Sequence, residues 1–307
     1  MNKQDADRAI PKEEAKETRL EPASRQGRSI MERFRMEQEG ARYREWRWAP
    51  EKVKRDAVVA EYGQLRRMVL HNLGVITTRN AENLIVTGCV VPFGMPLQLL
   101  AFFKLMDRLG IKYNIMRERE YCCGVGWVQG AKPSEYEAAL EYSKQAMQLN
   151  VEQTRDLGAK KMFYFCYMCC TLGKKFFINE EIEQKYFLDI FVGRLEKETL
   201  RVKPTTIGYY EGCWARPHII NPNLDINLPA YRKWLNRIEG LHIVEMPHRT
   251  CCVMNPSRIL DTAEANKVDC VVTPCTGCFV FLDRASRGRI PIKFLPELLL
   301  DAMPPEC

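Results

Sequence analysis

The cysteines constrain this chain more than any other feature of its sequence. There are thirteen among 307 residues, none before Cys89, and two pairs are adjacent: Cys122–Cys123 and Cys251–Cys252. Neighbouring cysteines are poorly placed for a disulfide with each other, because its torsion angle and Cα separation are specific. Two adjacent thiols at one site suit a cluster of several metal atoms better. The cysteine set therefore indicates thiolate ligands or redox chemistry.

Composition and charge are those of an ordinary globular protein. The hydrophobic fraction is 46%, the charged fraction is 28% and the net charge is +7, which excludes collagen-like and mostly disordered chains. The longest apolar runs, such as Met95–Phe103, are far shorter than the ~20 residues of a membrane span. The first thirty residues contain no apolar secretory core. We therefore expect a cytoplasmic protein without a transmembrane segment, peripheral to a membrane only through its partners.

After residue 82 the sequence alternates between short apolar strands and helices, a pattern typical of parallel sheets covered on both faces. The expected strands are Leu84–Thr87, Lys112–Met116, Met162–Phe165, Thr206–Tyr210, His242–Met246, Asp269–Thr273 and Ile290–Leu295. The expected helices are Pro96–Leu109, a long helix from Ser134 to Gly158 with a capping box of Ser134 and Glu137, Ala230–Ile238, Pro256–Ala265, Pro274–Arg287 and Pro296–Met303. The charged, aromatic-rich segment 171–205 is expected to be a packed crossover.

These elements predict an α/β fold with two pseudo-repeated, Rossmann-like parallel-sheet domains, residues 83–204 and 205–307. A polar tail and a mostly helical extension, residues 1–82, precede them. Within the extension, Glu51–Leu73 has the apolar spacing of an amphipathic helix, which we expect to pack on its own domain. Phe34–Trp48 carries aromatic residues among charges and is expected to contact a partner.

Each half places five cysteines just after its expected strands. The first set is Cys89, Cys122, Cys123, Cys166 and Cys169, and the second set is Cys213, Cys251, Cys252, Cys275 and Cys278. Similar offsets between the two sets indicate an internal duplication. The long helix of the first half is shortened in the second, because 42 residues separate Cys123 from Cys166 but only 22 separate Cys252 from Cys275.

The carboxyl ends of parallel strands meet at one edge of a sheet, so each set of thiols is expected to converge in one pocket. Glycines beside them (Gly88, Gly124 and Gly212) allow close approach of the backbone. Cysteine thiolates hold iron–sulfur clusters, and five thiols exceed the usual four of a cubane cluster or a zinc site. The pattern predicts two iron–sulfur sites, each with a fifth thiol that allows an unusual cluster or an exchangeable ligand.

The repeated order Cys, Cys-Cys-Gly and Cys-x-x-Cys resembles the CCG-domain (cysteine-rich domain) family, and most closely the B subunit of heterodisulfide reductase and its bacterial relatives. The resemblance covers about residues 83–285. The matching segments are TGCVVPFG, EYCCGVGWVQGAK, FYFCYMCC, YYEGCWARP, RTCCVMNPS and VVTPCTGC.

The resemblance implies that each CCG motif binds a non-cubane [4Fe-4S] cluster, with the five cysteines of its set as ligands. It also implies an oxidoreductase subunit that acts on sulfur groups and cleaves or forms the disulfide of a small thiol substrate, as in the pair coenzyme M and coenzyme B. The implied partners, which supply electrons, are the ferredoxin-type C subunit and the flavin-containing A subunit of such a complex.

The second motif departs from the signature, because Val253 stands where glycine is expected and its last interval is short. The second site is therefore open between a non-cubane cluster, another cluster type and structural zinc. The shortened second motif and the extension 1–82, which the usual B subunit lacks, favour a second interpretation of the whole protein. In this interpretation the chain is an electron-transfer and assembly subunit without a substrate of its own. A zinc-stabilised interaction module is the third.

Four other residues flank the second site: Arg216, His218, His248 and Arg249. Either histidine can replace a thiol, or hydrogen-bond and donate protons to sulfur, and either arginine can hold an anionic substrate or raise the potential of a cluster. Surface positions and ordinary salt bridges are the equal alternatives for all four.

The remaining candidates have weaker signals. Lys132, near the first site, is expected to be solvated. Of the three cysteines outside the two sets, Cys170 is a spare ligand, Cys270 belongs to the core and Cys307 is inert. The sequence contains no G-x-x-x-x-G-K-[ST] phosphate-binding loop and no recognised nucleic-acid module, so we expect no nucleic-acid partner.

Overall fold

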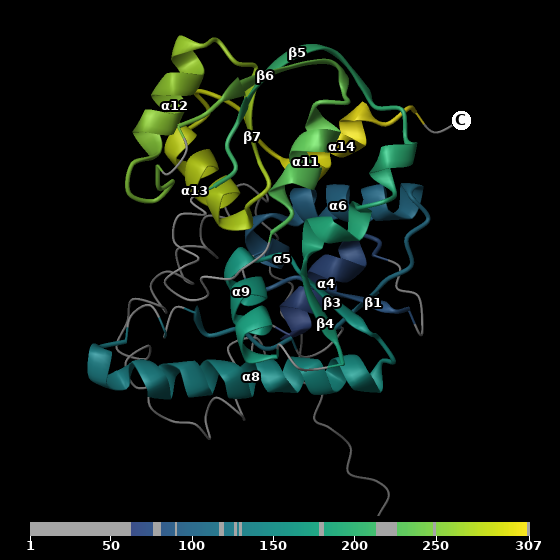
Figure 1. Ribbon diagram of the computed structural model, residues 1–307, viewed down its shortest axis with the longest axis vertical. Coiled ribbons are helices and arrows are strands. Elements are labelled where there is room, and N and C mark those ends of the chain that lie inside the picture. Colours follow the sequence, from purple (N-terminus) through teal and green to yellow (C-terminus); the bar gives the residue numbers. More distant parts are fainter. Residues whose placement is uncertain are drawn as a thin grey trace, which may run out of the picture.

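The computed structural model describes residues 63–75, 81–89, 91–116, 120–125, 128, 131–177, 181–212, 226–247 and 250–305 (Figure 1). The predicted polar tail, the aromatic segment Phe34–Trp48 and the first half of the predicted helix Glu51–Leu73 lie outside these residues. The second half of that helix is α4, Gly63–Asn72.

The first sheet has four parallel strands. They are β1 (Asn83–Val86), β2 (Asn114–Ile115), β3 (Lys161–Tyr164) and β4 (Glu183–Tyr186), in the spatial order β2-β1-β3-β4. Every pairing is parallel. The strands are short, and β1, β2 and β3 are almost fully buried, as expected for this architecture, while the edge strand β4 is exposed at its first residue.

The second sheet repeats this arrangement. Its strands are β5 (Arg201–Tyr209), β6 (Glu239–Glu245), β7 (Cys270–Thr273) and β8 (Ile292–Phe294), in the order β6-β5-β7-β8. All three pairings are parallel. The strand order is therefore the same in both sheets, and the α/β fold of two pseudo-repeated parallel sheets is confirmed.

Strand β4 lies inside the segment predicted as a crossover. The aromatic residues there are packed as expected, since Phe177, Tyr186, Phe187 and Phe191 are all buried. The strand itself was not predicted, because its sequence Glu-Gln-Lys-Tyr is almost entirely polar. It is stable at this position because β3 supplies its backbone partners and the Tyr164 hydroxyl donates a hydrogen bond to the side-chain oxygen of buried Gln184.

Most helices lie close to their predicted positions, with two additions, α5 (Val91–Gly94) and α9 (Tyr167–Phe176). The others after α4 are α6 (Pro96–Arg108), α8 (Tyr136–Asp156), α11 (Leu228–Leu235), α12 (Pro256–Ala265), α13 (Thr276–Ser286) and α14 (Leu295–Ala302). Short 3-10 turns cover Pro133–Glu135, Phe187–Phe191 and Leu195–Lys197.

The predicted capping box of Ser134 and Glu137 was wrong. A 3-10 turn precedes α8, and Glu135 instead accepts a hydrogen bond from the backbone N–H of Lys132 at 3.2 Å. Pro133 favours this early turn, since it has no N–H to satisfy. Helix α8 is 21 residues long and α12 only 10; Figure 1 shows α8 running the width of the first half.

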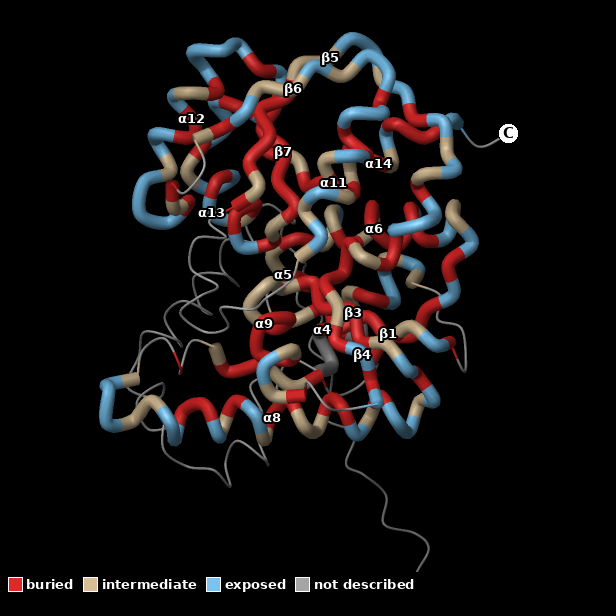
Figure 2. The backbone as a smooth tube through the Cα atoms, viewed as in Figure 1, coloured by how far each residue is buried: buried red, intermediate tan, exposed pale blue. Residues whose placement is uncertain are grey.

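The two halves share one hydrophobic core, visible as the continuous buried region between the sheets in Figure 2. Phe187 joins them, because its ring stacks on Phe165 of the first half at 4.5 Å and on Phe294 of the second at 5.3 Å between centroids. Helix α6 also packs on α14, where Gln98 donates a hydrogen bond to Glu297 at 3.0 Å.

We expect Phe187→Ala to lower the free energy of unfolding by about 3–5 kcal/mol, because it opens a cavity among stacked aromatic rings. Both halves should then unfold in one transition at lower denaturant concentration. The matched control is Phe281→Ala, since that ring is 41% exposed and its loss should cost far less. Equal effects of the two substitutions in denaturant titrations would contradict the shared core.

Candidate metal centre

The first set of cysteines lies at the carboxyl end of the first sheet. Strand β1 is central, with β2 on one side and β3 on the other, so the chain leaves β1 and β3 in opposite directions. Ligands of such sheets bind in the crevice at this switch point. Cys89 follows β1 and Cys166 follows β3, so these two thiols flank the crevice.

All five thiols of the first set form one connected group. Cys122 accepts hydrogen bonds from the thiols of Cys123 and Cys89. Cys169 contacts both Cys123 and Cys166 through its thiol. The prediction that strand ends bring these five sulfur atoms together therefore agrees with the positions of the side chains, and none of the described cysteines forms a disulfide.

Two of these thiols are stabilised as thiolates. The pKa of Cys122 is well below its ordinary value because the thiols of Cys123 and Cys89 and the backbone N–H of Gly124 donate hydrogen bonds to its sulfur. The pKa of Cys166 is lowered mainly by the Cys169 thiol and also by backbone N–H groups at the start of α9. Thiolates are the form that binds metal.

The neighbouring thiols act as donors, and their pKa values rise. The pKa of Cys89 is raised first by its hydrogen bond to Cys122 and then by burial. That of Cys169 is raised by its hydrogen bonds to Cys123 and Cys166. The group therefore combines two thiols whose thiolate form is favoured with others that a metal would have to deprotonate on binding.

Two glycines shape the loops that carry these thiols. Gly88 has φ +77°, and a Cβ built on it would lie 3.7 Å from the Cβ of Cys166. Gly124, directly after the cysteine pair, has φ +66°. Both conformations are strained for other residues, so these glycines set the turns that keep the backbone close to the sulfur group.

Helix α8 anchors the loop of the cysteine pair. The Asn150 side chain donates to the Tyr121 carbonyl and accepts from the Tyr121 N–H, both at 2.8 Å, and the Ser143 hydroxyl donates to the carbonyl oxygen of Cys123. Asn150 and Ser143 are buried. Sequence reasoning missed them, although polar residues on the apolar face of a helix are a signal for such contacts.

The second half repeats the Cys-x-x-Cys geometry. In both halves the first cysteine of this motif is the residue before a helix, Cys166 before α9 and Cys275 before α13. The Cys275 sulfur accepts a hydrogen bond from the Cys278 N–H at 3.5 Å. The sulfur atoms of Cys252 and Cys278 lie 3.4 Å apart, so the cysteine pair and the helix meet here too.

Burial alternates in the same way in both sets. Cys122 and Cys166 are half-buried, while their motif partners Cys123 and Cys169 are buried. In the second set the half-buried residues are Cys251 and Cys275, and the buried ones are Cys252 and Cys278. Each site thus has a closed inner side and a side that faces outward. The fifth member of the second set, Cys213, lies outside the described residues.

The loop of the second cysteine pair is held differently. The Tyr210 hydroxyl, at the end of β5, donates a hydrogen bond to the Thr250 carbonyl directly before Cys251. Among the described non-glycine residues only Lys267 and Arg287 have positive φ, so Val253 does not adopt the turn of Gly124. Its side chain is 53% exposed. The glycine-to-valine departure therefore changes the backbone path beside the second site.

Tyr186 connects the two sites. It is fully buried at the end of β4, and its hydroxyl donates a 2.8 Å hydrogen bond to the carbonyl of Pro274, the residue before Cys275. Burial raises its pKa, with smaller contributions from Cys275 and Cys166. A tyrosine of the first half thus fixes the loop that carries a thiol of the second.

The structure describes some of the other candidate residues and not the rest. Burial raises the pKa of Cys170 to about 12 and of Cys270 to about 11. Both thiols are buried, as expected for Cys270, and the spare-ligand role of Cys170 stays a prediction. Lys132 is exposed, as predicted. The remaining candidates lie outside the described residues; they are Arg216, His218, His248, Arg249 and Cys307.

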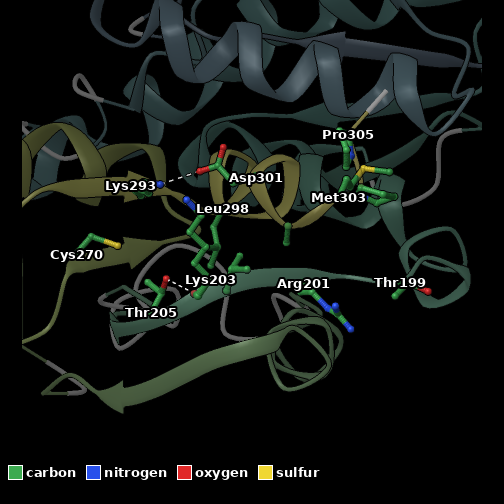
Figure 3. Close-up of a pocket in the computed structure, with 13 residues that line it drawn as sticks. Thr199, Arg201, Lys203, Thr205, Cys270, Lys293, Leu298, Asp301, Met303 and Pro305 are labelled. Carbon is green, nitrogen blue, oxygen red and sulfur yellow. Dashed lines mark hydrogen bonds and ion pairs between the residues drawn. The ribbon is translucent and has the colours of Figure 1, made fainter. Parts of the chain in front are cut away.

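A cavity of about 820 Å³ lies elsewhere, between the start of β5 and helix α14 (Figure 3). Arg201, Lys203, Cys270 and Lys293 line it, and Lys293 pairs with Asp301 at 2.8 Å. Because Arg201 and Cys270 begin β5 and β7, the cavity is at the amino end of the second sheet, whereas Cys275 follows the carboxyl end of β7.

The chemistry of the donor set fits an iron–sulfur cluster. The first site offers five thiols in contact, two of them favoured as thiolates, beside glycine turns that bring the backbone close to the sulfur atoms. In the part of the chain that the structure describes, no three or more His, Cys, Asp or Glu side chains are spaced to hold a single metal ion.

Comparison with known families agrees with these motifs. The CCG family model, a cysteine-rich domain, matches residues 84–172 and 255–283. The first segment contains all five cysteines of the first set, and the second contains Cys275 and Cys278. These two segments are therefore similar to the cysteine-rich CCG family. The resemblance predicted from the sequence is confirmed.

Curated relatives of these CCG segments are D subunits of dihydromethanophenazine:CoB–CoM heterodisulfide reductase. The protein from Methanosarcina barkeri is 24% identical over 253 residues, which cover 73% of this chain and 59% of that protein. The one from Methanosarcina mazei is 23% identical over 212 residues, covering 63% and 49%. The chain therefore spans only about half the length of the curated relatives it matches.

Solved structures give weaker similarity. A putative Asp/Glu racemase from Yersinia pestis has a TM-score of 0.35 and 10% identity, over 72% of this chain and 96% of its own. An aspartate racemase homologue from Pyrococcus horikoshii OT3 has a TM-score of 0.30 and 10% identity, over 71% of this chain and 96% of its own.

Among the described helices, none combines the length and apolar character needed to cross a bilayer.

We expect Tyr186→Phe to destabilise the protein by about 1–3 kcal/mol, because the buried Pro274 carbonyl loses its partner. Alkylation of Cys275 in the folded protein should also become faster. The matched control is Tyr209→Phe, since the buried Tyr209 hydroxyl has no hydrogen-bond partner among the described residues. Denaturant titration and mass-spectrometric labelling check both effects, and identical behaviour of the two variants would refute this role of Tyr186.

Proposed function

We propose that this protein is the iron–sulfur subunit of a heterodisulfide-reductase-like complex. The observation that carries the proposal is the contact of five thiols at the switch point of the first sheet. The CCG match and the relatives named as D subunits of heterodisulfide reductase support it. Within the complex we propose two partner subunits, one of the ferredoxin type and one that contains flavin. The proposed location is the cytoplasm.

The ligands we propose for the first cluster, a non-cubane [4Fe-4S] cluster, are Cys89, Cys122, Cys123, Cys166 and Cys169. The lowered pKa values of Cys122 and Cys166 favour their thiolate forms, while the pKa values of Cys89, Cys123 and Cys169 are raised, so these thiols would release protons on binding. The buried pair Cys123 and Cys169 forms the inner wall. The half-buried thiols Cys89, Cys122 and Cys166 border the outward side, by which a sulfur substrate would approach.

For the second site we propose the ligands Cys213, Cys251, Cys252, Cys275 and Cys278. The contact between Cys252 and Cys278 and the repeated helix-start position of Cys275 support a metal site there. Because the backbone at Val253 differs from that at Gly124, the second cluster is proposed to be of a different shape. Zinc is the alternative that four thiolates would also suit.

The proposed reaction is a two-electron change at sulfur. A disulfide RSSR′ takes up two electrons and two protons to give RSH and R′SH, or the reverse occurs, and the partner subunits supply or remove the electrons. A bound cluster would accept single electrons and provide an iron atom with affinity for thiolate sulfur. The chain's own residues hold the thiols in contact and bury the inner side of the site against water.

A second candidate is an electron-transfer and assembly subunit with no substrate of its own. The specific observation in its favour is exposed apolar surface beside the second cysteine pair, where Val253 is 53% and Met254 74% exposed. Such a surface suits contact with another protein of the complex better than contact with a small charged thiol. In that case electrons would pass through the sites to a partner enzyme.

Iron and sulfide assays test the metal assignment. After anaerobic reconstitution, Cys122→Ala and Cys252→Ala should each lose most of the iron and acid-labile sulfide of one site, because a ligand is missing. Cys170→Ala and Cys270→Ala are matched controls, since both remove a buried thiol outside the two sets, and they should keep both clusters. Zinc in place of iron at either site would contradict the cluster assignment for that site.

Spectroscopy separates the two functional candidates. We expect the EPR spectrum of the oxidised or half-reduced holoprotein to change when a small thiol or disulfide is added, because sulfur binds on the outward side of the first site. The spectrum of Cys170→Ala should respond like that of the unaltered protein. If no thiol or disulfide tested changes the EPR spectrum, the result would favour the electron-transfer role.

A further inference from the structure

The first site includes a residue from outside the CCG segments. Arg66 lies on α4, before the first matched segment, and only 1% of its side chain is exposed. Its Nη2 atom lies 2.6 Å from Glu120 Oε2 and 3.1 Å from the hydroxyl of Thr87. The Nε atom also approaches this hydroxyl at 3.3 Å, and Nη1 donates to the Met116 carbonyl.

Glu120 extends the contact to the loop that carries Cys89. Its carboxylate is 2% exposed. Oε2 accepts hydrogen bonds from the N–H of Thr87 at 3.0 Å and from its hydroxyl at 3.1 Å, and Oε1 accepts one from the N–H of Gly88. Glu120 precedes Cys122 by two residues, and Gly88 directly precedes Cys89.

This network therefore joins two loops whose thiols must meet. One guanidinium group contacts the carboxyl end of β1 at Thr87, the end of β2 at Met116, and the start of the cysteine-pair loop at Glu120. A buried ion pair is costly to desolvate and is weak evidence for stability. The guanidinium group of Arg66, however, is planar and carries several N–H donors, so it fixes the relative positions of its partners in a way that lysine cannot reproduce.

We propose that Arg66 is a positioning residue of the first metal site, acting through Glu120 to hold the Cys89 loop and the Cys122–Cys123 loop together. This inference rests on the proposed function of these thiols as cluster ligands. It makes α4, a helix N-terminal to the CCG segments, part of the site. The residue touches no reacting atom; it sets the separation at which Cys89 and Cys122 are in contact.

The test compares Arg66→Lys, Glu120→Gln and Thr87→Val with the unaltered full-length chain. The control is Leu99→Ala, which removes a fully buried apolar side chain of α6 but none of these hydrogen bonds. The first measurement is the rate at which each cysteine of the metal-free folded protein is alkylated, followed by mass spectrometry. Cys170 and Cys270 serve as internal reporters of general unfolding, because both are buried.

We expect alkylation of Cys89 and Cys122 to become about tenfold faster in Glu120→Gln and Arg66→Lys, since a hydrogen bond to a charged group is lost or weakened. Cys170 and Cys270 should change less than twofold. Thr87→Val, which removes a single hydroxyl, should give a smaller change in the same direction. Leu99→Ala should leave the ratio of Cys89 to Cys170 rates unaltered.

The second measurement is the EPR signature and midpoint potential of the reconstituted protein. The three network variants should shift both for the first cluster, while Leu99→Ala should not. Equal signals and unchanged alkylation ratios in the variants, with a normal cluster in the unaltered protein, would overturn the role of Arg66 and leave the proposed function standing. A uniform rise for all cysteines would also overturn it, since Arg66 would then support only general stability.

Failure of the proposed function has a different result. In that case the unaltered protein would bind neither iron nor sulfide after reconstitution, whatever residue 66 is. The alkylation measurement on metal-free protein still reports whether Arg66 and Glu120 hold the two loops together. The two outcomes are therefore distinguishable in the same set of samples.

Discussion

The contact of sulfur atoms at the end of the first sheet is the constraint on which the rest of the site depends. Five thiols come together there only because β1, β2 and β3 are parallel and end at the same edge. Strand geometry alone brings the loops near each other but does not fix the side chains within hydrogen-bonding distance. That last step requires the glycine turn at Gly88 and the polar anchors Glu120 and Asn150, each of which holds the backbone beside a cysteine.

The two halves share a fold but not these anchors. In the first, α8 holds the cysteine-pair loop through Asn150 and Ser143. In the second, the corresponding helix α12 is half as long, and Tyr210 at the end of β5 holds the loop instead. A duplicated sheet can therefore keep its cysteine positions while the surrounding support changes. This difference, together with the backbone at Val253, supports the proposal that the second site differs in shape from the first.

Much of this arrangement is predictable from sequence, for reasons that particular residues make plain. Strands such as Leu84–Thr87 are local apolar runs, so the α/β fold can be predicted. Cysteines follow these strands, and the ends of parallel strands meet at one edge, so the convergence of the first thiol set can be predicted too. Strand β4 cannot, because Glu183–Tyr186 is polar and is a strand only through its pairing with β3. The role of Arg66 cannot be predicted from sequence either, because its partners Thr87 and Glu120 lie 21 and 54 residues away and no local pattern points to them.

The connection between the halves bears on how the two sites work together. Tyr186 ends β4 of the first half, yet its hydroxyl holds the loop before Cys275 in the second, and Phe187 beside it stacks on both sides of the shared core. A displacement of β4 would therefore move a thiol loop of the second site, while β4 itself is paired to β3, which ends beside Cys166. This path consists of buried rings and strand pairing, so direct contacts connect the elements that carry the two sulfur groups. Two independent domains joined by a flexible linker would have no such link.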